Sequence, residues 1–140
     1  MSFPKFVARS MLASMFVISG VNAVKHSEAL APATDALLAN LPRQITDSLP
    51  DIPSEQLVKI NGATMTVAGS ALALGILPRF ASLVLAAQLV PVTVAGHRYW
   101  EKEGGERRGQ LIHFQKNVAL VGGLLLGALG GAKKVKKFKK

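Results

Sequence analysis

The residues best suited to chemistry in this 140-residue chain are its three histidines, which stand near the ends of apolar segments beside lysines and amides. Ammonium, amide and imidazole groups donate hydrogen bonds to a carbonyl oxygen, and neutral imidazole is also a common metal ligand. Such groups could hold the headgroup of a quinone or another small amphiphile, or a haem iron. The candidate set is Asn22, His26, Lys59, Asn61, Thr93, His97, His113, Lys116 and Asn117.

Several other chemistries lack the residues that they need. The chain has no cysteine, which excludes thiol relays, disulfide exchange and Cys-ligated clusters. No Asp or Glu lies inside an apolar segment, which argues against a carboxylate proton relay or a cation pump. Acyl transfer and hydrolysis have no recognisable set of nucleophile, base and orienting acid. We therefore assign no catalytic residue and no metal site, and we expect little catalytic activity from the chain alone.

The elements that must position the candidate groups are four apolar segments, residues 6–24, 57–77, 80–96 and 111–130. Each is close to the roughly 20 residues that a membrane-spanning helix requires. Helices of a soluble bundle would carry a charged outer stripe, and residues 67–77 and 118–131 carry no charge at all. The sequence predicts an all-α fold, a four-helix transmembrane bundle that forms one membrane domain over residues 1–132.

The first segment has an alternative interpretation as a cleaved signal peptide. Lys5 and Arg9 precede its apolar run, and Val21, Asn22 and Ala23 form an acceptable small-residue cleavage pattern. Serines dilute the apolar run, however, and its helical character continues past Ala23. We therefore expect a spanning helix here.

The loop between the first two segments, residues 25–56, is weakly acidic and is predicted to lie outside the cytoplasm. Within it, residues 31–41 have Pro32 at a plausible first helical turn and leucines placed for one apolar face. We expect a short extracytoplasmic helix that lies on the membrane surface.

Basic residues set the predicted orientation. Lys5, Arg9, Arg79 and the tail at residues 133–140 fall on one side of a four-helix topology, which predicts a multi-pass membrane protein with both termini cytoplasmic. The net charge of +9 is concentrated in that tail, so we expect contact with anionic lipid rather than with nucleic acid. The lysines predicted to bind lipid headgroups are Lys133, Lys134, Lys136, Lys137, Lys139 and Lys140.

Small residues predict how the helices associate, since lipid provides no hydrophobic drive for helix packing. Three helices carry them on one face. The predicted packing positions are Ala13 and Gly20, which flank Phe16, in the first helix, Gly62, Thr66, Gly69 and Ala73 in the second, and Gly123, Gly127 and Gly131 in the fourth.

On the fourth helix His113, Lys116 and Asn117 share one face, and the topology brings the other candidates to the same membrane level. Three interpretations follow. Polar residues could simply collect where helices meet headgroups, with Tyr99 and Trp100 as interfacial anchors. They could form a polar pocket for a quinone headgroup or another small amphiphile. His97 and His113 could instead ligate a haem or a metal.

Three stretches carry a family resemblance: "ARSMLASMFVISGVNAV", "NGATMTVAGSALALGILPRFASLVLAAQLVPVTVAGHRYW" and "FQKNVALVGGLLL". Together they resemble the DoxX family of small bacterial membrane proteins in its actinobacterial form, over roughly residues 8–126. The resemblance implies a four-helix integral protein of the bacterial inner membrane. It also implies a link to membrane complexes of redox and sulfur-handling enzymes under oxidative stress, since the family takes its name from a subunit of a thiosulfate:quinone oxidoreductase. It carries no catalytic residue over to this chain.

The function predicted from the sequence is therefore that of an accessory or anchoring subunit of a membrane-associated redox complex, in contact with lipid and with a protein partner. Two alternatives stay open. The chain could be the quinone-binding component of an oxidoreductase, or a carrier or receptor for a small amphiphile. No other cofactor is expected.

Overall fold

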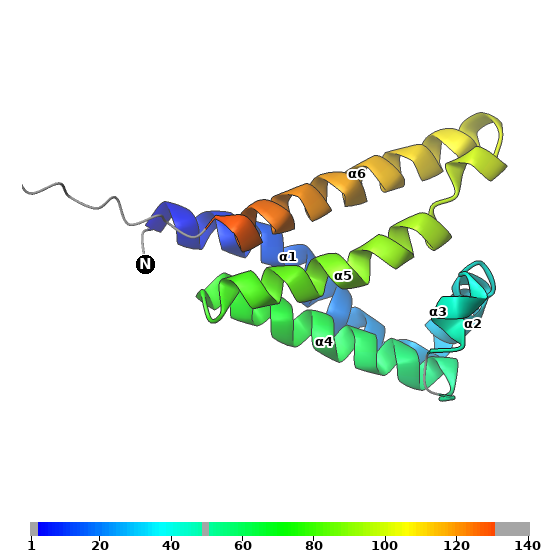
Figure 1. The fold of residues 1–140 in the computed structure, drawn as a ribbon, viewed down its shortest axis with the longest axis horizontal. Helices are drawn as coiled ribbons and strands as arrows, with labels where there is room; N and C mark the ends of the chain where they lie inside the picture. The colour runs from blue at the N-terminus through cyan, green and yellow to red at the C-terminus, as the bar shows by residue number, and fades with distance from the viewer. Residues whose placement is uncertain (1–2, 49–50, 131–140) are drawn as a thin grey trace, which may run out of the picture.

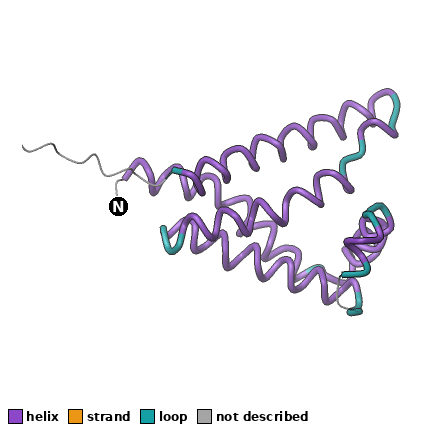
Figure 2. The backbone as a smooth tube through the Cα atoms, viewed as in Figure 1, coloured by secondary structure: helices purple, strands orange, loops and turns teal. Residues whose placement is uncertain are grey.

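The computed structural model describes residues 3–48 and 51–130, and within them the chain forms helices and no strand. Figure 2 shows helices joined by short loops. The long helices are α1 (Phe3–Lys25), α4 (Ser54–Leu74), α5 (Pro78–Gly96) and α6 (Gly104–Leu129). The short ones are α2 (Ser27–Ala39), α3 (Arg43–Thr46) and the 3-10 helix η1 (Tyr99–Glu101). The lysine tail and Gly131 lie outside the described residues.

The four long helices are long and apolar enough to cross a membrane, so the chain is a multi-pass membrane protein with an all-α bundle. Their exposed side chains include many large hydrophobic ones, as expected for surfaces that face lipid. In Figure 1 the beginning of α1 and the end of α6 lie together at one end, here named the terminal end. The short helices α2, α3 and η1 lie at the opposite end, named the loop end.

Small residues bring α1 and α4 into close backbone contact, as the sequence predicts, and these two helices pack along most of their lengths. A Cβ atom at Gly20 would lie 2.5 Å from the Gly62 carbonyl oxygen, and one at Gly62 would lie 2.7 Å from the Gly20 carbonyl oxygen. Further toward the terminal end, a Cβ at Gly69 would lie 2.9 Å from the side chain of Val17. Only glycine allows the backbones to approach this closely.

The second packed pair is the hairpin of α5 and α6, and it joins the first pair near the terminal end. Gly127 of α6 faces Ser82 of α5, whose hydroxyl would lie 2.9 Å from a Cβ at that position. Leu85 and Leu124 are completely buried and share one core with Phe16 of α1. From this core the two pairs diverge toward the loop end, as Figure 1 shows.

A left-handed turn joins α4 to α5. Gly75 has φ 73°, its N–H donates to the Leu72 carbonyl, and the next N–H, of Ile76, donates to the Ala71 carbonyl. This pair of bonds is the Schellman motif, which suits glycine because a Cβ atom disfavours positive φ. Pro78 then begins α5, where its missing N–H costs nothing.

The helix α2 begins earlier than predicted, at Ser27 rather than near residue 31, so Pro32 lies inside it. The reason is that helical hydrogen bonding continues from α1 across a bend. The His26 N–H donates to the Asn22 carbonyl, and the Leu30 N–H donates to the His26 carbonyl. The helix α2 packs on α4 and reaches the end of α5, where Arg98 donates a 3.0 Å hydrogen bond to the Asn40 side chain.

The helix α6 also begins earlier than predicted, at Gly104 rather than near residue 111. Its first turns combine three glycines with Glu106, Arg107 and Arg108, which form helix readily, and the Arg107 N–H donates to the Glu103 carbonyl. Lys102 pairs with Glu106 at 2.9 Å, and this carboxylate raises the pKa of Lys102. The earlier start puts Lys116 about three turns into the helix.

Candidate functional site

The structure divides the nine candidate residues into separate groups, although the sequence places them at one membrane level. The first group is the histidine pair, His97 at the end of α5 and His113 of α6. Their rings stack with centroids 5.3 Å apart and planes 17° apart. Nδ1 of His97 also lies 2.8 Å from Oε1 of Gln110, which fixes the orientation of the His97 ring.

Aromatic residues that neighbour the histidine pair in the sequence form a cluster at the loop end. Tyr99 lies edge-on to both Trp100 and Phe114, with ring centroids 5.1 and 5.3 Å apart. The guanidinium of Arg98 lies 5.9 Å from the centre of the Trp100 ring and forms an ion pair with Glu101 at 2.7 Å. Amphipathic rings of this kind anchor a helix end at the headgroup level of a membrane.

The histidine pair does not have the geometry of two axial haem ligands. Axial imidazoles point their nitrogens at the iron from opposite sides, whereas stacked rings turn their faces to each other. One nitrogen of His97 is also engaged by Gln110. Among the described residues, no group of three or more His, Cys, Asp or Glu side chains could hold a metal ion.

The polar groups of α1 and of the first turns of α4 make local contacts instead. Nδ1 of His26 lies 3.1 Å from the Asn22 carbonyl oxygen, and both residues are exposed. Lys59 pairs with Glu55 at 2.6 Å, one turn earlier in α4. Glu55 also accepts a 3.4 Å hydrogen bond from Ser27, which ties α2 to α4. These contacts stabilise the loop end and do not join the histidine pair.

Three further candidates differ sharply in burial. Asn117 and Thr93 are each 4% exposed, and the Thr93 hydroxyl donates to the Leu89 carbonyl at 2.6 Å. Lys116 is exposed, on a helix whose length and composition suit a membrane span. It therefore faces the surroundings of the bundle and not its interior, in contrast to the inward face predicted for it.

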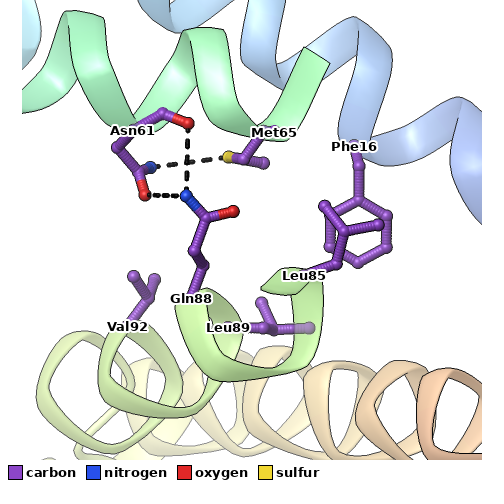
Figure 3. Close-up of a pocket in the computed structure, with 7 residues that line it drawn as sticks. All are labelled: Phe16, Asn61, Met65, Leu85, Gln88, Leu89 and Val92. Atoms are coloured by element: carbon purple, nitrogen blue, oxygen red, sulfur yellow. Dashed lines mark hydrogen bonds between the residues drawn. The ribbon is translucent and has the colours of Figure 1, made fainter. Parts of the chain in front are cut away.

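The remaining candidate, Asn61 of α4, belongs to a polar contact inside the bundle. Nε2 of Gln88 on α5 donates to Oδ1 of Asn61 at 2.9 Å and to its carbonyl oxygen at 3.4 Å. Nδ2 of Asn61 in turn lies 3.5 Å from the Met65 sulfur. Figure 3 shows this amide pair, Asn61 and Gln88, bridging the space between α4 and α5.

The amide pair lies where a cavity and a groove meet. The cavity has a volume of about 90 Å³ and is lined by Phe16, Asn61, Met65, Leu85, Gln88, Leu89 and Val92. The groove has a volume of about 470 Å³ and runs between α2, α4 and α5. Asn61, Gln88 and Val92 line both, so the two spaces are neighbours. The other groove residues are mostly alanine, valine and leucine.

Sequence reasoning did not include Gln88 among the candidates. The signal was present, since Gln88 is the one glutamine inside residues 80–96, a segment that otherwise offers few polar side chains. A polar side chain in a spanning helix needs a partner, and one on a facing helix is the usual solution. The sequence does not identify Asn61 as this partner, because which residues of α4 and α5 lie opposite each other depends on how the two helices pack.

The comparisons with known proteins give one match. The family model for DoxX matches residues 5–98, which covers α1 except for its first two residues and all of α2 to α5. The residues of α6 that contribute to the resemblance, among them Phe114, Lys116 and Asn117, lie outside this range. Searches of curated proteins and of solved structures gave no match. Since the matched range is well over half of the chain, this multi-pass membrane protein belongs to the DoxX family.

Proposed function

We propose that the chain is an accessory or anchoring subunit of a membrane-associated redox or oxidative-stress complex. It would lie in the bacterial inner membrane with both termini cytoplasmic. Membership of the DoxX family supports the redox setting, and the basic residues near the terminal end support the orientation. The role as a subunit is supported by one structural observation, the exposure of Lys116.

Lys116 lies near the middle of α6, twelve residues after Gly104 and thirteen before Leu129. At a rise of about 1.5 Å per residue it stands about 20 Å from the end at Leu129, within a hydrocarbon core about 30 Å thick. None of the ion pairs among the described residues involves the Lys116 ammonium, and the residue is exposed. A lysine costs roughly 2.5 to 3.5 kcal/mol at the centre of a bilayer and less toward either face, so this range is an upper value for Lys116.

A neighbouring subunit that offers a carboxylate would remove this cost, and it would cover the face of α6 that carries Lys116. The four long helices bury few of their side chains, and α1 and α6 touch at few positions, including Leu12 against Gly123. The bundle therefore offers broad helix surfaces to another membrane protein. This arrangement suits a subunit that assists a redox enzyme without supplying the reactive groups.

The test is to isolate the tagged chain from its native membrane and to measure its partner stoichiometry. Lys116→Met removes the charge and keeps the side-chain length, so the amount of bound partner should fall at least about tenfold, corresponding to about 1.4 kcal/mol. Lys116→Arg should retain the partner. The matched control is Lys59→Met, because Lys59 is already paired with Glu55 in the first turns of α4. Equal partner recovery with Lys116→Met and the wild-type chain would contradict the proposal.

A further inference from the structure

The oxygen atom of the Gln88 side chain is buried and accepts no hydrogen bond from any residue that the structure describes. Its amide nitrogen is engaged by Asn61. Figure 3 shows the oxygen pointing away from Asn61, into the space bordered by Met65, Leu89 and Phe16. A buried acceptor without a donor costs about 1 to 3 kcal/mol, so a bound group that donates a hydrogen bond would stabilise this site.

The oxygen faces the cavity of about 90 Å³, and the groove that adjoins this cavity at the amide pair favours a neutral, largely apolar molecule. None of the described residues that line it is charged, and its walls are aliphatic apart from Thr34 and the amide pair. A phosphate or an ammonium group would find no counter-ion there, and burial of an unpaired charge is strongly unfavourable. The volume of about 470 Å³ falls within the range of ligand pockets, roughly 300 to 1,000 Å³.

The depth of the amide pair adds a further restriction. Asn61 lies seven residues after the start of α4, and Gln88 lies eight before the end of α5, so both stand about 10 to 12 Å from the loop end of their helices. Most phospholipid headgroups stay at the membrane surface. A headgroup at this depth must have a small free energy of transfer from the membrane surface into the hydrocarbon region. A single hydroxyl meets this condition.

We propose that the cavity and the adjoining groove between α2, α4 and α5 together bind a neutral membrane amphiphile, whose headgroup hydroxyl enters the cavity and donates a hydrogen bond to Oε1 of Gln88. The apolar part of the molecule lies in the groove beneath α2, against residues such as Leu37 and Leu57. A reduced quinol and a long-chain alcohol share this chemistry. An oxidised quinone does not, because its carbonyl oxygens only accept hydrogen bonds. The proposal does not depend on the subunit role.

The test compares a hydroxyl with its methyl ether. The purified chain is placed in phosphatidylcholine nanodiscs that contain equal amounts of hexadecanol and hexadecyl methyl ether, and native mass spectrometry counts the adducts. The alcohol should bind about tenfold more than the ether, which is the effect of one hydrogen bond to a buried group. Lipid extracted from the natively purified chain then distinguishes a quinol from another hydroxyl-bearing lipid.

Three variants complete the test. Gln88→Leu should bring the ratio of alcohol to ether to about one, and Gln115→Leu, which changes an exposed glutamine of α6, should leave the ratio unchanged. Ala33→Phe fills the groove from α2 without touching the amide pair, so it should remove both adducts even if Gln88→Leu does not fold. Absence of any adduct on the wild-type chain, which would leave only water in the cavity, overturns the proposal. So does a wild-type ratio near one, or a ratio that Gln88→Leu does not change.

Discussion

Replacement of Gly20 by alanine should weaken the bundle at the contact between α1 and α4. The new Cβ would lie 2.5 Å from the Gly62 carbonyl oxygen and 2.8 Å from the Thr66 backbone nitrogen. Ordinary van der Waals contact begins at 3.4 Å, so the helices must move apart locally by about 0.9 Å. Because the opposing atoms belong to the backbone of α4, a rotamer change cannot relieve the clash. Overpacking of this kind typically costs about 1 to 3 kcal/mol.

Alanine also forms helix more readily than glycine, by up to about 1 kcal/mol in water, and this gain opposes the clash. Gly122→Ala measures this gain in helix propensity without a clash, since a Cβ at Gly122 would meet nothing within 4 Å. The propensity term is similar in both variants. The difference between them therefore measures the clash, and Gly20→Ala should be less stable than Gly122→Ala by about 1 to 3 kcal/mol.

The assay is unfolding of the purified chain in mild detergent by titration with sodium dodecyl sulfate, followed by circular dichroism. The double variant Gly20→Ala with Gly62→Ala should lose less stability than the sum of the single losses, because both substitutions widen the same contact. Equal stability of Gly20→Ala and Gly122→Ala would refute the close approach of α1 and α4 at these glycines.

Three further substitutions test other parts of the fold by the same titration. Gly75→Ala should destabilise the chain by about 1 kcal/mol or more, because φ 73° disfavours a Cβ atom, and a loss near zero would contradict the left-handed cap. Ser82→Ala should stabilise it by about 1 kcal/mol, since the completely buried hydroxyl has no partner among the described residues; a loss of stability would show that the hydroxyl is bonded. Leu85→Ala should cost about 2 to 5 kcal/mol through the cavity that it leaves, and a cost below 1 kcal/mol would contradict its complete burial.

The helical bundle could be predicted from the sequence because its signals are local. A spanning helix is recognised from its length and its lack of charge, and each predicted segment overlaps a helix that is long and apolar enough to span. The glycines of α1 and α4 were likewise assigned correctly to packing, since close approach requires small residues wherever the partner lies. Helix ends were less accurate, because the charged turns that begin α6 form helix outside the apolar segment.

The candidate site was less accessible to sequence reasoning. The topology predicts the membrane level of each candidate residue. Whether two candidates touch depends on how far apart the helices that carry them lie at that level. His97 and His113 meet because α5 and α6 form a hairpin, whereas His26 lies in the bend between α1 and α2. Whether any of the nine candidate residues binds a ligand remains a prediction. The same holds for the quinone expected from the sequence and for the headgroup contacts of the lysine tail.

The most direct test of the proposed subunit role is native purification. The tagged chain would be extracted from its own membrane in mild detergent, and all proteins that travel with it would be quantified by mass spectrometry. The account predicts a redox enzyme in a fixed ratio to the chain, which is lost on Lys116→Met and kept on Lys59→Met. Recovery of the wild-type chain alone, folded and without a stoichiometric protein partner, would contradict it.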